Sequence, residues 1–161
     1  ATTLKALGVP AAVLTGAQGA SFLPSPADTT DEYVKLFQEI NAKYNNNVAF
    51  DNNVLVGMNS AMMTVQALRA AGKNLTRAGL IAAIQNKGAT FASAGLAPLN
   101  YSATSQVGYN GYWFGQYDST GAMKPLSGGV VVYTTDSGTG AVVKSSYKRP
   151  AMPAKGLPTN S

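Results

Sequence analysis

The side chains that could perform chemistry are few in this sequence. The chain has no cysteine and no histidine, and only seven residues are Asp or Glu. Thiolate nucleophiles, zinc sites of the usual Cys/His type and Ser-His-Asp triads therefore cannot be built from it. Any acid–base chemistry would have to come from a carboxylate, a lysine or a tyrosine.

Two short patterns resemble functional motifs, and each is better explained otherwise. The segment SSYK, residues 145–148, has the S-x-x-K spacing of penicillin-binding enzymes, but it lies between an expected strand and a Pro-rich segment. The glycine-rich stretch 16–21 lacks the lysine and the following helix of a phosphate loop. Asp28, Asp31 and Glu32 suit the start of a helix better than an acid–base pair. We therefore expect no enzymatic activity, no metal site and no cofactor.

The composition predicts one folded domain without a nucleic-acid partner. Of the 161 residues, 45% are apolar and 12% are charged, which excludes a disordered chain. Residues 1–51 carry three Lys/Arg against five Asp/Glu, and residues 52–161 carry nine against two, so charges of −2 and +7 give the net +5. The basic residues are spread along the sequence, whereas nucleic-acid surfaces usually cluster them. We expect these charges to lie on a solvated surface.

Three helices are expected to position whatever site exists. The T-x-x-E spacing of Thr29 and Glu32 predicts a capping box and a helix over 30–44. Its expected buried stripe is Tyr33, Phe37, Ile40 and Tyr44. A second helix is expected over 53–71, with the apolar stripe Val54/Leu55, Met58, Ala61/Met62, Val65 and Leu68. Thr76 is expected to cap a third helix that ends near Gln85.

Short strands are expected around these helices. Apolar runs predict buried strands at 11–14 and 20–23. Over 107–117 the residues alternate, with Tyr109, Gly111, Trp113, Gly115 and Tyr117 expected on one face. A turn at 118–121 and a strand pair formed by 130–133 and 141–144 should follow. Residues 150–161 contain three prolines and are expected to form an extended tail.

Several motifs follow one another along the chain in a recognisable order. They are the aromatic-striped helix EYVKLFQEINAKY, ALRAAG at 67–72, NLTRAGLIAAI at 74–84, GLAPLNY at 95–101 and YWFGQYDSTG at 112–121. In this succession, residues 30–128 resemble the C-terminal lobe of type I periplasmic solute-binding proteins, the branched-chain amino acid-binding family of ABC transporters. The resemblance covers about two-thirds of the chain. Where the family's long helix usually begins with Y-D-A, this chain has Met58-Asn59-Ser60.

The resemblance implies an α/β fold. Residues 1–149 would form one Rossmann-like lobe, with helices packed on a central, mostly parallel sheet and a β-rich C-terminal part, and residues 150–161 a Pro-rich tail. Family members have two lobes, so we expect this chain to be a fragment that lacks the N-terminal lobe, with a stand-alone relative as the alternative. An isolated lobe would expose apolar surface and could self-associate.

The resemblance also implies a function. The chain would be the extracytoplasmic substrate-binding component of an ABC importer, with the transporter's membrane subunits as partner. It would capture a small polar organic solute, such as a branched-chain or other amino acid, an amide or a small aromatic acid, in a cleft between lobes. By position in the family's pattern, the expected ligand contacts are Thr15, Gln18, Phe50, Asn52 and Asn53. The last three could instead be plain loop or helix-cap residues, because asparagine is a common N-cap.

Two other classes of function stay open at this point. The basic C-terminal half and the Pro-rich tail could form a small interaction domain that docks an acidic partner, and rising salt would weaken such binding. An enzyme with a lysine or tyrosine base would require a strongly perturbed pKa beside a pocket.

Overall fold

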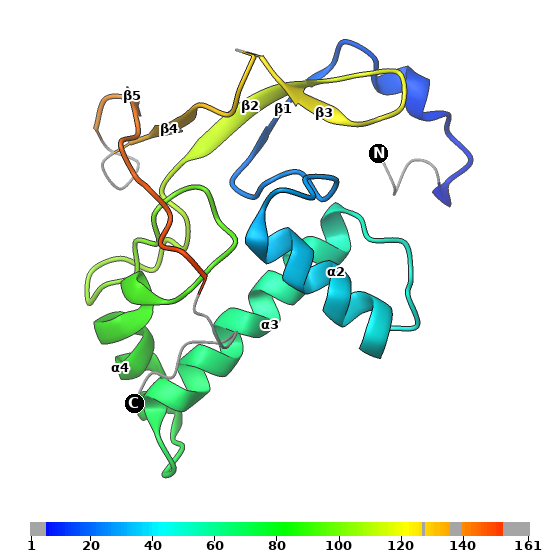
Figure 1. Ribbon diagram of the computed structural model, residues 1–161. Coiled ribbons are helices and arrows are strands. Elements are labelled where there is room, and N and C mark those ends of the chain that lie inside the picture. Colours follow the sequence, from blue (N-terminus) through cyan, green and yellow to red (C-terminus); the bar gives the residue numbers. More distant parts are fainter. Residues whose placement is uncertain (1–5, 127, 136–139, 153–161) are drawn as a thin grey trace.

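The computed structural model describes residues 6–126, 128–135 and 140–152. Within these residues the fold is mixed α/β, with a group of helices on one side and a twisted sheet on the other (Figure 1). The helices are α2 (Glu32–Tyr44), α3 (Asn52–Ala71) and α4 (Arg77–Lys87), with 3-10 turns η1 (Ala11–Leu14) and η2 (Gly88–Thr90). The strands are β1 (Gln18–Ser21), β2 (Tyr112–Tyr117), β3 (Met123–Pro125), β4 (Val132–Thr134) and β5 (Val143–Lys144).

The start of α2 differs from the predicted capping box. Asp31 is the N-cap, and its carboxylate accepts hydrogen bonds from the backbone N–H groups of Tyr33 and Val34 at 3.0 and 3.1 Å. The T-x-x-E prediction was wrong because the helix begins two residues later than predicted, at Glu32, where Asp31 caps its free N–H groups. The predicted end is confirmed, since Asn46 and Asn47 adopt left-handed φ angles just after the helix.

The aromatic stripe of α2 is buried only in its first half. Tyr33 and Phe37 are buried, whereas Ile40 and Tyr44 are 37% and 73% exposed. In the second half the buried residue is Asn41, whose amide donates to the Val48 carbonyl at 2.7 Å. The loop after α2 therefore folds back over a polar side chain, and the predicted apolar stripe ends early.

The other two helices are confirmed to within two residues at each end. Thr76 caps α4 as predicted, because its hydroxyl accepts a hydrogen bond from Gly79 N–H at 3.0 Å. The buried face of α3 is more polar than predicted, since Val65 and Leu68 are partly exposed while two polar side chains are buried. Those two are Asn59 and Gln66.

The expected mostly parallel sheet is wrong for the described residues. Every strand pair is antiparallel: β1 with β2, β2 with β3, β2 with β4, and β4 with β5. All three α-helices lie in one run between β1 and β2, and the remaining connections are too short for a helical crossover. Parallel neighbours need such crossovers, so the later strands can pair only as hairpins and antiparallel neighbours.

Some predicted strands moved or changed type. Residues 11–14 form a 3-10 helix with no buried residue, because Val13 N–H donates to Pro10 and Thr15 N–H to Ala12. The predicted strand 20–23 is observed as β1, two residues earlier, and the strand predicted over 107–117 begins only at Tyr112. Its predicted alternation is confirmed, with Trp113 and Gly115 buried between exposed neighbours.

The predictions for the C-terminal part of the chain agree with the structure over the described residues. The turn at 118–121 and the strand pair, observed as β4 and β5, are confirmed. Residues 150–152 form neither helix nor strand, and the rest of the predicted tail, 153–161, lies outside the described residues.

The core lies between the helices and the loops that cross them. Its main cluster is Leu23, Tyr33, Val34, Phe37, Leu55, Met62 and Ala94, and a smaller one is Ala67, Phe91 and Leu99. Trp113 connects the sheet to this layer, because its indole N–H donates to the Leu23 carbonyl at 2.7 Å. The strand β2 is thereby anchored above the N-terminal end of α3 (Figure 1).

Candidate ligand-binding site

Three of the five predicted contact residues line one pocket. Phe50, Asn52 and Asn53 lie at the N-terminal end of α3, which faces the β2–β3 hairpin and the segment after β1 (Figure 1). The pocket has a volume of about 320 Å³, within the range of small-molecule sites. We call it the α3 N-terminal pocket.

The two asparagines are available to a ligand. They occupy the first turn of α3, where backbone N–H groups have no intrahelical acceptor. Asp51 is the N-cap, and its carboxylate accepts from Val54 N–H at 3.0 Å. The alternative that Asn52 or Asn53 is the helix cap is therefore wrong. Neither side chain makes a hydrogen bond to another residue within the described ranges, and both are exposed.

Phe50 has a second role beside the pocket. It is half-buried and packs against the main core cluster, so its ring forms a fixed wall rather than a mobile cover. The opposite walls come from segments distant in sequence, namely Ser21 of β1 and Trp113 and Tyr117 of β2.

Thr15 and Gln18 are not part of this pocket. Thr15 ends η1, where its N–H donates to the Ala12 carbonyl. Gln18 lies in β1 opposite Gln116 and is exposed. The structure therefore separates these two residues from the three that line the pocket.

Sequence reasoning did not assign the β2 residues to the site. The alternation had placed Trp113 and Tyr117 on one face of a strand, but nothing local shows what that face meets. The pairing of β1 with β2 carries that information, and it joins residues nearly a hundred positions apart, as in Ser21 with Trp113.

A second, more charged pocket of about 600 Å³ adjoins the first. The two share Pro24, Ser25, Trp113 and Met123 among their lining residues, and the second adds charged side chains. These are Asp28, Asp31, Lys124 and Arg149.

Three of the four charged side chains of this adjoining pocket already have partners within the protein. The hydroxyl and N–H of Thr30 hold the pKa of the Asp28 carboxyl below its usual value. Arg149 pairs with Asp31 at 2.5 Å. Lys124 makes no ion pair with a described residue, and it is exposed. A ligand that spans both pockets would therefore meet the Lys124 ammonium group, which has no acidic partner among the described residues.

Among the described residues there is neither a carboxylate cluster for a metal ion nor a helical S-x-x-K motif. Within the described part of the chain, no group of three or more Asp and Glu residues is placed to hold a metal ion. The S-x-x-K segment lies outside helices, and Ser145 Oγ accepts a hydrogen bond from Tyr147 N–H at 3.1 Å. It therefore lacks the helical placement that its chemistry requires. None of the described helices is long and apolar enough to cross a membrane.

Comparisons with known proteins add no assignment to this geometry. The chain matches no model of a protein family, no curated protein and no solved structure.

Proposed function

We propose that this chain is the C-terminal lobe of a solute-binding protein that serves an ABC importer. One observation carries the proposal: Phe50, Asn52 and Asn53, expected as ligand contacts by resemblance, line a single pocket in which both asparagine amides are free. The described helices and antiparallel sheet would form the ligand-facing part of that lobe. The importer's membrane subunits would be the partner, in an extracytoplasmic location.

The pocket suits a small polar organic solute. An amide group donates two hydrogen bonds and accepts others, so Asn52 and Asn53 can bind a carbonyl, carboxylate or ammonium end. Phe50 and Pro24 offer an apolar wall for the rest of the molecule. Lys124 in the adjoining pocket favours a carboxylate there. Amino acids, amides and small aromatic acids all combine these features.

The open shape of the pocket supports a two-lobe arrangement. Asn52 and Asn53 are exposed on one side of the solute, so this lobe alone would bury only part of it. Binding sites of this class bury most of the ligand surface. A second lobe that closes over the solute would supply the remaining contacts.

The test is a thermal-shift screen on the full-length product of the gene that encodes this chain. The panel contains leucine, glutamine, acetamide and benzoate. A solute that binds the native state raises the melting temperature in proportion to the logarithm of its concentration, once saturating. We expect one compound class to do so, and a flat response across the panel in a folded protein would contradict the proposal.

Substitutions in the α3 N-terminal pocket test whether the stabilising solute binds there. Asn52→Ala and Asn53→Ala should each weaken binding of the stabilising solute about five- to ten-fold, as expected for one hydrogen bond to a polar or charged group. Asn86→Ala is the matched control, because Asn86 is an exposed residue of α4 outside the pocket. Equal affinities in all three variants would place the solute elsewhere.

A further inference from the structure

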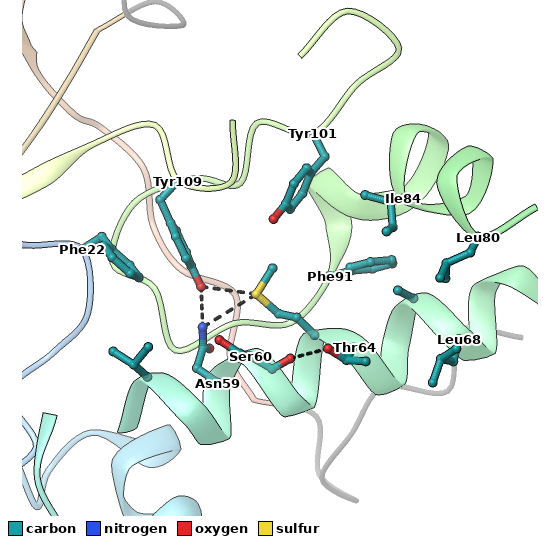
Figure 2. A pocket seen from close by; sticks show the side chains of 13 residues that line it. Phe22, Asn59, Ser60, Thr64, Leu68, Leu80, Ile84, Phe91, Tyr101 and Tyr109 are labelled. Carbon is teal, nitrogen blue, oxygen red and sulfur yellow. Dashed lines mark hydrogen bonds between the residues drawn. The ribbon is translucent and has the colours of Figure 1, made fainter. Parts of the chain in front are cut away.

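A separate pocket lies between α3 and α4 and shares no lining residue with the α3 N-terminal pocket. Its volume is about 410 Å³. One wall follows α3 at helical spacing through Asn59, Met63 and Ala67, and α4 contributes Leu80 and Ile84 (Figure 2). We call it the α3–α4 pocket.

The walls of this pocket exclude ions. None of its lining residues is charged, and most of the lining surface comes from aliphatic and aromatic side chains. Burying a charge against such walls without a partner costs several kcal/mol. A ligand here must therefore be uncharged.

The polar groups at one end of the pocket are already engaged. The Asn59 amide donates to the Tyr109 hydroxyl at 2.6 Å and accepts from Ala94 N–H at 2.8 Å. The Ser93 hydroxyl bonds to the same Tyr109 oxygen. Phe22 stacks on the Tyr109 ring with centroids 4.3 Å apart, so this end is held rigid. These groups have little capacity left for a ligand.

Tyr101 differs from them. Its ring packs against the smaller core cluster, and its hydroxyl points into the α3–α4 pocket (Figure 2). Within the described residues this hydroxyl makes no hydrogen bond. Phenolic hydroxyls among apolar groups usually have a partner. Tyr101 therefore supplies an open donor that faces the apolar interior, whereas the Ser60 hydroxyl, also without a partner among the described residues, belongs to an exposed residue of α3.

We propose that the α3–α4 pocket binds a small uncharged molecule with an aromatic or branched apolar body and one carbonyl or ether oxygen that accepts from the Tyr101 hydroxyl. The body would lie between Met63, Leu80, Ile84 and Phe91. This site is independent of the α3 N-terminal pocket and would remain if that proposal failed.

Three probes of similar shape test the proposal. Acetophenone carries the carbonyl acceptor, ethylbenzene lacks it, and benzoate carries a charge. Titrations followed by two-dimensional amide NMR spectra should show acetophenone perturbing resonances of Phe91 and Tyr101. Its affinity should exceed that of ethylbenzene about five-fold, which is what one neutral hydrogen bond contributes, and benzoate should shift these two amides least.

Two variants identify the donor and the location. Tyr101→Phe keeps the ring and should reduce acetophenone binding to the level of ethylbenzene. Thr64→Phe, at an exposed rim position of α3, should weaken both neutral probes. Asn86→Ala, at an exposed position of α4 outside both pockets, should leave both unchanged.

The proposal is overturned if acetophenone perturbs no amide of the pocket in a folded protein. It is equally overturned if benzoate shifts the Phe91 and Tyr101 amides at a lower concentration than acetophenone does, or if Tyr101→Phe binds acetophenone as well as the original protein does. Benzoate bound in the α3 N-terminal pocket would instead shift residues 50–53.

Discussion

At the scale of single residues, Asn59 joins three segments that are distant in sequence. It is 3% exposed, and its amide contacts Tyr109, Ser93 and the backbone of Ala94. Gln66, about two turns later in α3, similarly holds the N–H and carbonyl of Ala92 at 2.7 and 2.8 Å. The loop after α4 has no regular structure here, so these amides replace the backbone partners that a sheet would supply.

Asn59→Ala should lower the free energy of unfolding by about 2–4 kcal/mol, because it leaves the buried Ala94 N–H without its acceptor and removes one hydrogen bond each from the Tyr109 and Ser93 hydroxyls, which still bond to each other. Urea denaturation measures this loss. Asn86→Ala on the exposed face of α4 is the control and should change stability by less than about 0.5 kcal/mol. Equal effects of the two variants would show that the Asn59 contacts do not hold the loop.

Because Tyr109 is buried, we expect the protein to lose folding stability at alkaline pH. Burial raises its pKa above the usual value, with hydrogen bonds from Ser93 and Asn59 opposing that rise. The folded state then holds the proton more tightly than the unfolded state. The contribution is complete below the unfolded pKa of about 10 and is lost as the pH rises through the folded pKa.

Urea denaturation at increasing alkaline pH, with tyrosinate absorption to follow ionisation, measures this effect. Tyr109→Phe should flatten the decline. A decline of the same steepness in Tyr109→Phe would assign the effect to other tyrosines, such as Tyr33, whose pKa is also raised by burial.

Asn59 and Gln66 also show where sequence reasoning stops at this scale. The bounds of α3 were predicted to within one residue, but the predicted stripe contained only apolar residues. The burial of Asn59 and Gln66 depends on loop groups 26 to 35 positions away. No local pattern contains that information.

At the scale of elements, the helices were predictable and the pairing of strands was not. The start of α4 at Thr76 and the end of α2 at its asparagines are local signals, and both are confirmed. The direction of β1 against β2 depends on the whole intervening chain, and the predicted parallel sheet was wrong. Residues 11–14 show the ambiguity of a short apolar run, which formed a 3-10 turn instead of a strand.

Two glycines give opposite predictions for the same substitution. A Cβ at Gly57, in α3, would meet nothing within 4 Å, so Gly57→Ala should stabilise the protein by about 0.5–1 kcal/mol through helix propensity. A Cβ at Gly115 would lie 2.6 Å from the Lys124 carbonyl oxygen and 2.9 Å from the Trp113 ring. Gly115→Ala should therefore destabilise the β2–β3 hairpin.

Thermal denaturation of both variants measures these effects. A stabilised Gly115→Ala would contradict the observed approach of β3 to β2. A destabilised Gly57→Ala would show that this face of α3 is covered in the protein.

At the scale of the whole molecule, an ion pair fastens the chain's last described segment to the start of α2. Asp31 caps α2 with one carboxylate oxygen and pairs with Arg149 through the other, across 118 positions. Arg149 also donates to the Ala94 carbonyl at 2.8 Å and lies over the Tyr33 ring at 4.6 Å. The residue that sequence analysis had counted among solvated basic groups is thus a structural one.

Asp31→Asn and Asp31→Ala separate the two roles. Asparagine caps a helix as well as aspartate does, so Asp31→Asn removes mainly the charge pair, whereas Asp31→Ala removes the cap as well and should cost about 1 kcal/mol more. Urea denaturation of both variants measures the difference. Identical stabilities would show that the Asp31 cap contributes nothing once the ion pair is lost.

Which of the predicted contact residues lie together also depends on the whole fold. Phe50, Asn52 and Asn53 were identified from their place before and at the start of the long helix, and they line one pocket. Thr15 and Gln18 were identified from a segment whose local structure was mispredicted, and they lie outside that pocket. The positions taken from the family's pattern therefore meet in one pocket only near the helix that was predicted correctly.

The central claim is that a solute binds at the N-terminal end of α3. Amide NMR titration of the protein with the compound that most raises its melting temperature tests it most directly. The account predicts that the largest shifts fall on residues 50–53, with smaller ones at Ser21 and Trp113 across the pocket. Shifts confined to other parts of the chain, with residues 50–53 unmoved at saturation, would contradict it.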